Sequence, residues 1–265
     1  MRIKDTHDLT EYFVRCKLER TERKWSRLRA KNIVGRLLFK RICSRRRMER
    51  FAELYFEGKK ADWELIPENP VGDVLDVACD IPLDGFWIGR LPGIRRVVLT
   101  DLKKPVGLPL PKIDFVKANA TRLPFPDNSF DLVTSFSSVE HCMNRKAQAQ
   151  WIQEMTRVTK PNGIVAITVD NAQSILNGFP FFLVIPNKQM LPLSWSTLER
   201  MILSSGPIRI EKKASSRLYQ YTSWLRPWAE SLPSYWLEKA LTPVNGKVPI
   251  LDARIGIQYR KLAAQ

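Results

Sequence analysis

The chain has 265 residues, 44% of them hydrophobic, which suffices for one α/β domain with a full core and an accessory segment. No run of about 18 uncharged apolar residues occurs and the first residues lack the apolar core of a signal peptide, so we expect a cytoplasmic protein without a membrane-spanning helix. Four scattered cysteines without CxxC spacing and two histidines, His7 and His141, predict free thiols and no metal site.

Positive charge is concentrated in the first part of the chain. Residues 1–60 contain 19 Lys and Arg against 8 Asp and Glu, a net charge of +11 in a chain whose total is +16. Such an arm is typical of contact with an anionic surface, either membrane headgroups or RNA, and a solvated helical face is the alternative. Contact with lipid would place the protein at the inner face of a membrane as a peripheral protein.

Residues 8–57 have apolar side chains at helical spacing and predict helices. The stretch RLLFKRICSRRRMERF (36–51) is basic and amphipathic, which suits a membrane surface or a nucleic-acid backbone. Alternatively, its apolar side packs on the main domain. The turn-rich stretch Pro67–Asp73 marks a boundary, so we expect a basic helical extension over 1–66 and an α/β domain over 67–265.

Strands alternate with helices after this boundary. The pattern predicts a helix over 145–160, ended by Pro161-Asn162-Gly163, and buried strands over 73–78, 95–102, 113–119, 129–138 and 163–169. Three prolines in 103–112 predict an extended connection rather than a helix. Strands joined by helical crossovers form a parallel, doubly wound sheet, whose ligands bind at the carboxyl ends of the strands.

The remaining residues predict a helix capped by Ser194 or Ser196, a sixth strand up to about 214 and a seventh over 253–262. An insert over 216–248 is rich in Trp and Tyr. It suits a substrate lid, an interfacial anchor or a dimer surface, and a helix packed on the domain is the alternative. The apolar stretch 176–186 is a candidate wall of an acceptor pocket.

Four segments in order resemble the class I S-adenosylmethionine (SAM)-dependent methyltransferases, specifically the type 11 small-molecule group. They are VLDVACDIPLDG (74–85), VVLTDL (97–102), ANATRLPFPDNSFDLVTSFSSVEHC (118–142) and EMTRVTKPNGIVAITV (154–169). The resemblance implies a Rossmann-like, seven-stranded α/β fold and SAM as cofactor. It also implies methyl transfer to a small molecule or to a membrane-associated lipid or glycan.

The loop after the first strand departs from the family pattern, in which an acidic residue precedes three alternating glycines. Asp76 keeps the acidic position, and the glycines are replaced by Ala78, Asp80 and Pro82. Pro82 removes an N–H donor and fixes φ. In a second registration Asp84-Gly85 forms the turn and residues 86–91 form a short helix. The loop therefore decides between a modified working site and a catalytically inactive fold that serves as an RNA- or ribonucleoprotein-binding or scaffold module.

The predicted strand ends supply the candidate site residues. Asp101 is expected to accept hydrogen bonds from the ribose hydroxyls, with a strand-end cap as the alternative, and Asn119 from the adenine amino group. His141 is the candidate base, with Glu140 as alternative or orienting partner, although His141 is equally suited to packing or capping. The predicted cofactor-binding residues are Asp76, Ala78, Cys79, Asp80, Asp101, Leu102, Asn119, Ala120, Ser135 and Phe136.

An active RNA methyltransferase is a third alternative. The aromatic NPPY-type motif expected for methylation of a base amine is absent from the sequence, which argues against one subclass of nucleic-acid methyltransferases. The sequence does not predict the oligomeric state.

Overall fold

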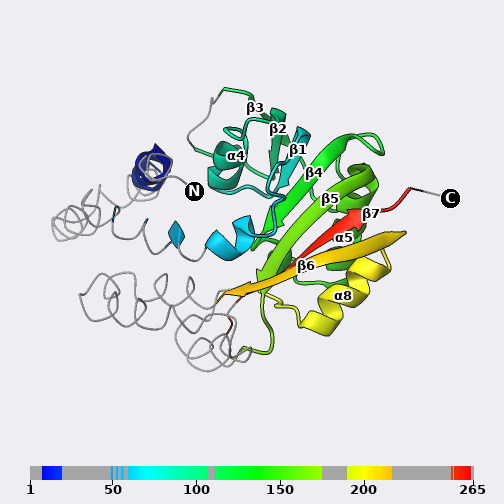
Figure 1. Ribbon diagram of the computed structural model, residues 1–265. Coiled ribbons are helices and arrows are strands. Elements are labelled where there is room, and N and C mark those ends of the chain that lie inside the picture. Colours follow the sequence, from blue (N-terminus) through cyan, green and yellow to red (C-terminus); the bar gives the residue numbers. More distant parts are fainter. Residues whose placement is uncertain are drawn as a thin grey trace.

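The computed structural model describes residues 8–19, 49, 52, 55–56, 59–106, 111–174, 190–216, 252 and 254–263. Within this part of the chain a seven-stranded sheet has the order β3-β2-β1-β4-β5-β7-β6 (Figure 1). The elements are β1 (Gly72–Val77), α4 (Leu83–Ile88), β2 (Ile94–Asp101), β3 (Ile113–Lys117), β4 (Phe130–Phe136), η1 (Val139–His141), α5 (Arg145–Val158), β5 (Thr159–Asp170), α8 (Trp195–Leu203), β6 (Ile208–Ser216) and β7 (Arg254–Lys261).

The strand directions place the site. β1 pairs with β2 and β4 in parallel, and β2–β3 and β4–β5 are parallel as well. β7 runs antiparallel to both of its neighbours, β5 and β6. The strand order reverses between β1 and β4, so the carboxyl ends of these strands form the crevice in which such sheets bind ligands. The predicted Rossmann-like seven-stranded fold is confirmed, with an antiparallel edge that the crossover pattern alone did not predict.

Several boundaries differ from those predicted. Helix α5 ends at Val158, and β5 already begins at Thr159 and runs through Pro161-Asn162-Gly163, with Asn162 at a φ of 64°. Ser194 is the N-cap of α8, since its side chain accepts a hydrogen bond from the Thr197 N–H. The described parts of the connection 103–112 contain no helix. Residues 176–186 and 217–248, the predicted pocket wall and most of the aromatic insert, lie outside the described residues.

The amino-terminal segment packs on the α/β domain. Residues 8–19 are helical and lie beside α4 (Figure 1), where Tyr12 stacks on Phe86 with ring centroids 4.2 Å apart. Phe13 stacks on Tyr55 at 4.6 Å. These side chains belong to the same hydrophobic cluster as the inner residues of β1 and β2. Residues 8–19 thus form a helix packed on the domain. The same arrangement was stated as an alternative for residues 36–51, which, apart from Glu49, lie outside the described residues.

The opposite face of the sheet is covered by α5 and α8. Ile152 and Met155 of α5 are buried with Leu198 and Ile202 of α8 in a second cluster. Tyr259 of β7 is fully buried here, and its hydroxyl lies 2.8 Å from Thr156 Oγ1. Among the described residues, no helix is long and apolar enough to cross a bilayer, and no group of three His, Cys, Asp or Glu is placed to hold a metal ion.

Replacement of Gly256 by Ala is expected to destabilise the protein by about 2 kcal/mol, because the core there has no space for a methyl group. An added Cβ would lie 2.4 Å from Thr168 Cγ2, 2.6 Å from Leu65 Cδ1 and 2.9 Å from the Ile167 carbonyl oxygen. Denaturant unfolding measures the loss. Gly89→Ala is the comparison, since its closest contact is 3.1 Å and its φ of −61° is helical; equal losses would contradict the argument.

Candidate functional site

The carboxyl ends of β1, β2 and β4 are tied together by side chains from the predicted site. Ser138 Oγ, after β4, donates to the Ala78 carbonyl oxygen at 3.1 Å. The Asp80 N–H donates to Asp101 Oδ2 at the end of β2, also at 3.1 Å. These contacts join the three strand ends, the edge of the sheet at which the sequence predicts the site.

The loop after β1 keeps a backbone that suits glycine although it has none. Ala78 has a φ of 61° and Asp80 a φ of 41°, both in the left-handed region that disfavours residues with a Cβ by about 1–2 kcal/mol. Pro82 has an ordinary φ of −76° and is the N-cap of α4. The ungapped registration is therefore the one that the backbone supports, with Ala78 and Asp80 taking glycine-like conformations.

The second registration, with Asp84-Gly85 as the turn and a helix over 86–91, is wrong. Both residues lie in the first turn of α4, which begins at Leu83. An added Cβ on Gly85 would lie 2.4 Å from Leu99 Cδ2 of β2. Gly85 thus permits the close packing of α4 on the sheet rather than a turn, the role of the third glycine in dinucleotide-binding loops.

Asp76 is the most unusual side chain of the crevice. Only 3% of it is exposed, and Thr134 Oγ1 donates to its Oδ1 at 2.9 Å, while Oδ2 has no hydrogen-bond partner among the described residues. Burial, followed by the nearby charge of Asp84, raises the pKa of Asp76 to about 7. A buried oxygen without a partner is costly unless a ligand supplies one. The ammonium group of the cofactor's amino-acid part fits this requirement.

Asp101 and Asn119, the residues expected to hold ribose and adenine, differ in how far their hydrogen bonds agree with the prediction. Asp101 accepts from the N–H groups of Asp80 and Lys103, both at 3.1 Å, and each oxygen keeps a further lone pair for a ribose hydroxyl. Asn119 Oδ1 accepts from Thr121 N and Oγ1 at 3.0 and 2.9 Å. Both lone pairs of this oxygen are thereby used, so the amide NH₂ is what Asn119 offers to a ligand. Leu102 is 63% exposed beside Asp101.

Four further predicted cofactor residues are buried. Ser135 lies within β4, and its Oγ has no hydrogen-bond partner in the described chain. Phe136 ends β4, with the ammonium of Lys59 5.3 Å from its ring centroid. Ala120 belongs to the hydrophobic cluster under α5, and Cys79 to the cluster on the other face. Cys16, Cys79 and Cys142 are free thiols.

The two candidate bases differ sharply in environment. His141 is exposed at the end of η1. Glu140 is only 1% exposed, and neither of its carboxyl oxygens has a hydrogen bond of normal geometry in the described part of the chain. Burial and then the neighbouring Asp170 raise the pKa of Glu140 well above its ordinary value. Of the two, Glu140 has the environment of a functional carboxyl group.

A buried chain of charges beside the crevice was missed by the sequence analysis. Lys59 Nζ lies 2.7 Å from Asp84 Oδ2 and 3.0 Å from Asp62 Oδ2. Asp62 is in turn paired with Arg254 Nη1 at 3.0 Å. The only signal in the sequence is the helical i,i+3 spacing of Lys59 and Asp62, which is common on exposed helices and does not indicate burial.

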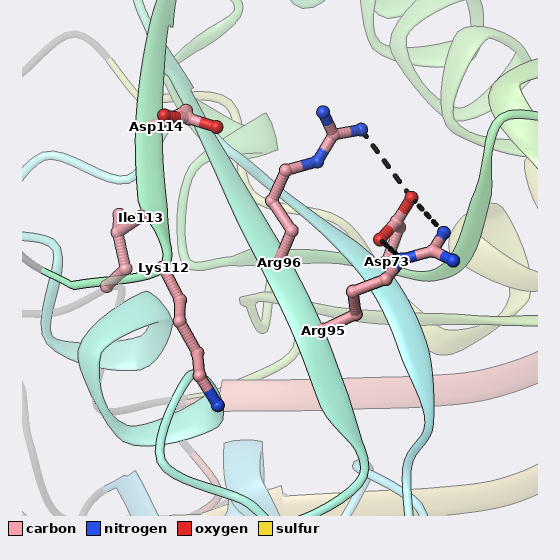
Figure 2. Close-up of a pocket in the computed structure, with 6 residues that line it drawn as sticks. All are labelled: Asp73, Arg95, Arg96, Lys112, Ile113 and Asp114. Carbon is pink, nitrogen blue, oxygen red and sulfur yellow. Dashed lines mark hydrogen bonds and ion pairs between the residues drawn. The ribbon is translucent and has the colours of Figure 1, made fainter.

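A cavity of about 580 Å³ lies elsewhere, at the amino-terminal ends of β1, β2 and β3 (Figure 2). Arg95 donates two hydrogen bonds to Asp73, at 2.8 and 2.6 Å, and Arg96 lies 3.5 Å from the same carboxylate. Asp73 thus partly neutralises the positive charge of this cavity. Because ligands of parallel sheets bind at the other end of the strands, this cavity is not the predicted site. It is lined by Asp73, Arg95, Arg96, Lys112, Ile113 and Asp114.

Part of the chain matches a family model, and several curated proteins are similar to it. Residues 94–167 match the family model described as "Methyltransferase domain". Demethylmenaquinone methyltransferase from Bacillus mycoides (strain KBAB4) is 28% identical over 185 residues, which are 66% of this chain and 69% of that protein. The protein of the same name from Lysinibacillus sphaericus (strain C3-41) is 30% identical over 125 residues, 47% of this chain and 44% of that protein.

Solved structures share the fold. The S-adenosylmethionine dependent methyltransferase from Mesorhizobium loti superposes with a TM-score of 0.56 at 14% identity, covering 77% of this chain and 98% of that one. Phosphoethanolamine N-methyltransferase 2 from Haemonchus contortus, solved in complex with SAM, gives a TM-score of 0.57 at 15% identity, covering 79% of this chain and 53% of that one. These likenesses show that the fold is shared, and together with the family match they support the resemblance to class I SAM-dependent methyltransferases.

Proposed function

Residues 94–167 belong to the methyltransferase domain family, and from this premise we propose that the protein is an active SAM-dependent methyltransferase for a small-molecule acceptor. The observation that carries the proposal is the loop after β1. Ala78 and Asp80 hold left-handed conformations there without glycine, at a conformational cost that a retired site has no reason to keep. A modified working site therefore explains the loop better than a scaffold does.

The chain's residues divide the cofactor between them. Asp76 accepts from the ammonium group, Asp101 accepts from the ribose hydroxyls, Leu102 packs on the adenine ring, and Asn119 donates to a ring nitrogen. SAM supplies a methyl group made electrophilic by the sulfonium. The protein's main task is then to hold the acceptor atom in line with that methyl group, since displacement needs positioning more than acid–base chemistry.

Glu140 is the better candidate for accepting a proton from a hydroxyl acceptor. It is buried at the carboxyl ends of β4 and β5 beside Asp170, and a carboxylate whose pKa is raised is a stronger base than an ordinary one. His141 is exposed, and we place it at the rim of the site rather than at the reacting atoms.

For the acceptor we favour a membrane-associated lipid. Two relatives are named for demethylmenaquinone, and residues 1–60 carry a net charge of +11 that suits an anionic headgroup surface. A glycan carried on a lipid is the alternative with the same surface requirement. This proposal places the protein at the inner face of a membrane as a peripheral protein.

Calorimetric titration with SAM and with its product S-adenosylhomocysteine (SAH) is expected to show micromolar binding. Asp101→Asn is expected to weaken it about tenfold, because the ribose loses a charged acceptor. Asp114→Asn is the matched control and is expected to leave the affinity unchanged. Asp114 is an exposed carboxylate at the start of β3, the strand beside β2, and therefore lies at the opposite edge of the sheet from Asp101. If the protein fails to bind at millimolar ligand, the inactive scaffold becomes the better description.

The acceptor class is tested with vesicles and with RNA. Flotation with vesicles containing phosphatidylserine is expected to carry the protein along, with binding that falls as salt rises. Replacement of Arg45, Arg46 and Arg47 by Glu is expected to abolish it. Deletion of residues 1–60 is a poorer test because it removes Tyr12, Phe13 and other core side chains. Binding to RNA without binding to vesicles would favour the scaffold or an RNA methyltransferase.

A further inference from the structure

The helix over residues 8–19 contacts α4 and the segment that follows β2. Its Tyr12 stacks on Phe86 of α4, with ring planes 16° apart, and α4 directly follows the loop after β1. One turn further along the helix, Cys16 Sγ lies 4.0 Å from the carbonyl oxygen of Val106, five residues beyond the end of β2. The helix is therefore anchored on both segments that border the cofactor crevice (Figure 1).

The hydroxyl group of Tyr12 has no oxygen or nitrogen hydrogen-bond partner among the described residues, and the thiol of Cys16 is the neighbour with which it interacts. The side chain is 4% exposed. Burial is the main cause that raises the pKa of Tyr12, so the group is a neutral donor at any physiological pH. The thiols of Cys16 and Cys79 lie close enough to affect this pKa, but sulfur is a weak acceptor. A buried hydroxyl left in this state costs roughly 1–3 kcal/mol.

Two unsatisfied groups of opposite kind therefore border the loop after β1. Tyr12 offers a donor from the helix, and Asp76 offers an acceptor from β1. Cys79, within the loop and three residues after Asp76, is buried in the same hydrophobic cluster as Tyr12. A ligand that satisfies both needs an acceptor and a cationic donor on one small group. An α-amino acid has this pair, a carboxylate and an ammonium.

We propose that Tyr12 binds the carboxylate of the cofactor's amino-acid part, and that the helix over 8–19 is a wall of the cofactor site. The inference rests on the proposed function and extends it to a segment outside the matched family region. Tyr12 donates to the carboxylate while Asp76 accepts from the ammonium. The first part of the chain thus contributes to cofactor binding as well as to its predicted surface contact.

The test compares Tyr12→Phe with the unchanged protein by calorimetry and thermal unfolding. Because Phe keeps the ring that stacks on Phe86 and removes only the orphaned hydroxyl, the ligand-free variant is expected to melt at the same temperature or slightly higher. Its Kd for SAH is expected to rise about 5- to 20-fold. For 5′-methylthioadenosine, which lacks the amino-acid part, the two proteins are expected to bind equally.

Tyr259→Phe is the matched control. Its hydroxyl is hydrogen-bonded to Thr156 in the core, so this variant is expected to melt at a lower temperature and to bind SAH normally. Two results would overturn the inference while leaving the proposed function intact: unchanged SAH affinity in Tyr12→Phe, or an equal loss of affinity for both ligands. If the unchanged protein binds neither ligand, the proposed function fails, and the role of Tyr12 fails with it.

Discussion

Replacement of Asp76 by Asn is expected to stabilise the ligand-free protein while weakening its affinity for SAH. The carboxyl group is buried, and one of its oxygens has no partner among the described residues. In the folded protein it holds its proton up to a pH of about 7, whereas in the unfolded chain it ionises near its ordinary value of 3.8. Stability from this group is therefore lost as pH rises between those two values, by an amount on the order of 2–4 kcal/mol.

The gain in the free energy of unfolding on substitution of Asp76 depends on pH over the same range. Asp76→Asn is expected to match the unchanged protein below pH 4 and to exceed it increasingly up to pH 7, above which the difference stays constant. Asp84, Lys59 and Asp101 also act on the pKa of Asp76, so the observed midpoint belongs to the cluster. Denaturant unfolding at pH 5 and pH 8 measures the difference. Asp114→Asn, an exposed carboxylate, controls for charge alone and is expected to stay within about 0.5 kcal/mol.

Ligand binding reverses the preference. Because only the ionised carboxylate pairs well with an ammonium group, SAH binding is expected to tighten as pH rises from 6 to 8 and to lose this dependence in Asp76→Asn. The loss of affinity at pH 8 is expected to be at least tenfold. A stabilised variant that still binds SAH normally at pH 8 would contradict the assignment of Asp76 to the cofactor.

Replacement of Lys59 by Met is expected to cost about 3–5 kcal/mol of stability, because it leaves the buried Asp84 carboxylate without its cation and leaves Asp62 with Arg254 alone. The lysine is 4% exposed and contacts Asp84 and Asp62. Burial lowers the pKa of Lys59, but the two carboxylates together raise it by more than burial lowers it. The net pKa of Lys59 therefore lies well above its usual value. Met is similar in length and apolar, so the loss reports the missing charge rather than a cavity.

The control and the rescue are both available nearby. Lys60→Met changes the adjacent, exposed lysine and is expected to stay within about 0.5 kcal/mol. In the double variant Lys59→Met, Asp84→Asn, part of the loss is expected to return, since the new amide side chain is neutral and its oxygen can still accept from Trp63 Nε1. A loss below about 1 kcal/mol for Lys59→Met would show that the pair is not buried in solution.

Most of the fold was predictable because its signals are local. The apolar runs predicted where the strands lie in the sequence, and the amphipathic pattern of 145–158 predicted the helix between two of them. Asp76, Asp101 and Asn119 were then selected because they lie near the predicted carboxyl ends of strands. The start of α4 was not predictable from local signals. Asp84-Gly85 has the composition of a turn, yet Lys59 and Trp63 bind the Asp84 carboxylate and hold it inside a helix.

The site was predictable in position but not in bonding. Which group Asn119 offers depends on Thr121 two residues later, whose N–H and hydroxyl both use the amide oxygen. Helical spacing predicted a helix over residues 8–19, but not that the hydroxyl of Tyr12 lacks an oxygen or nitrogen partner among the described residues. Hydrogen-bond satisfaction depends on residues distant in sequence, and pattern analysis of one chain does not reveal them.

The place of β7 in the sheet has a consequence for biosynthesis. β6 pairs only with β7 in the described sheet, and β7 lies between β6 and β5. During translation α8 and β6 leave the ribosome before β7, and about forty residues separate the end of β6 from the start of β7. Until β7 appears, one edge of β5 is unpaired. The sheet therefore closes only after β7 has been synthesised, and until then these open edges are where a chaperone is most needed.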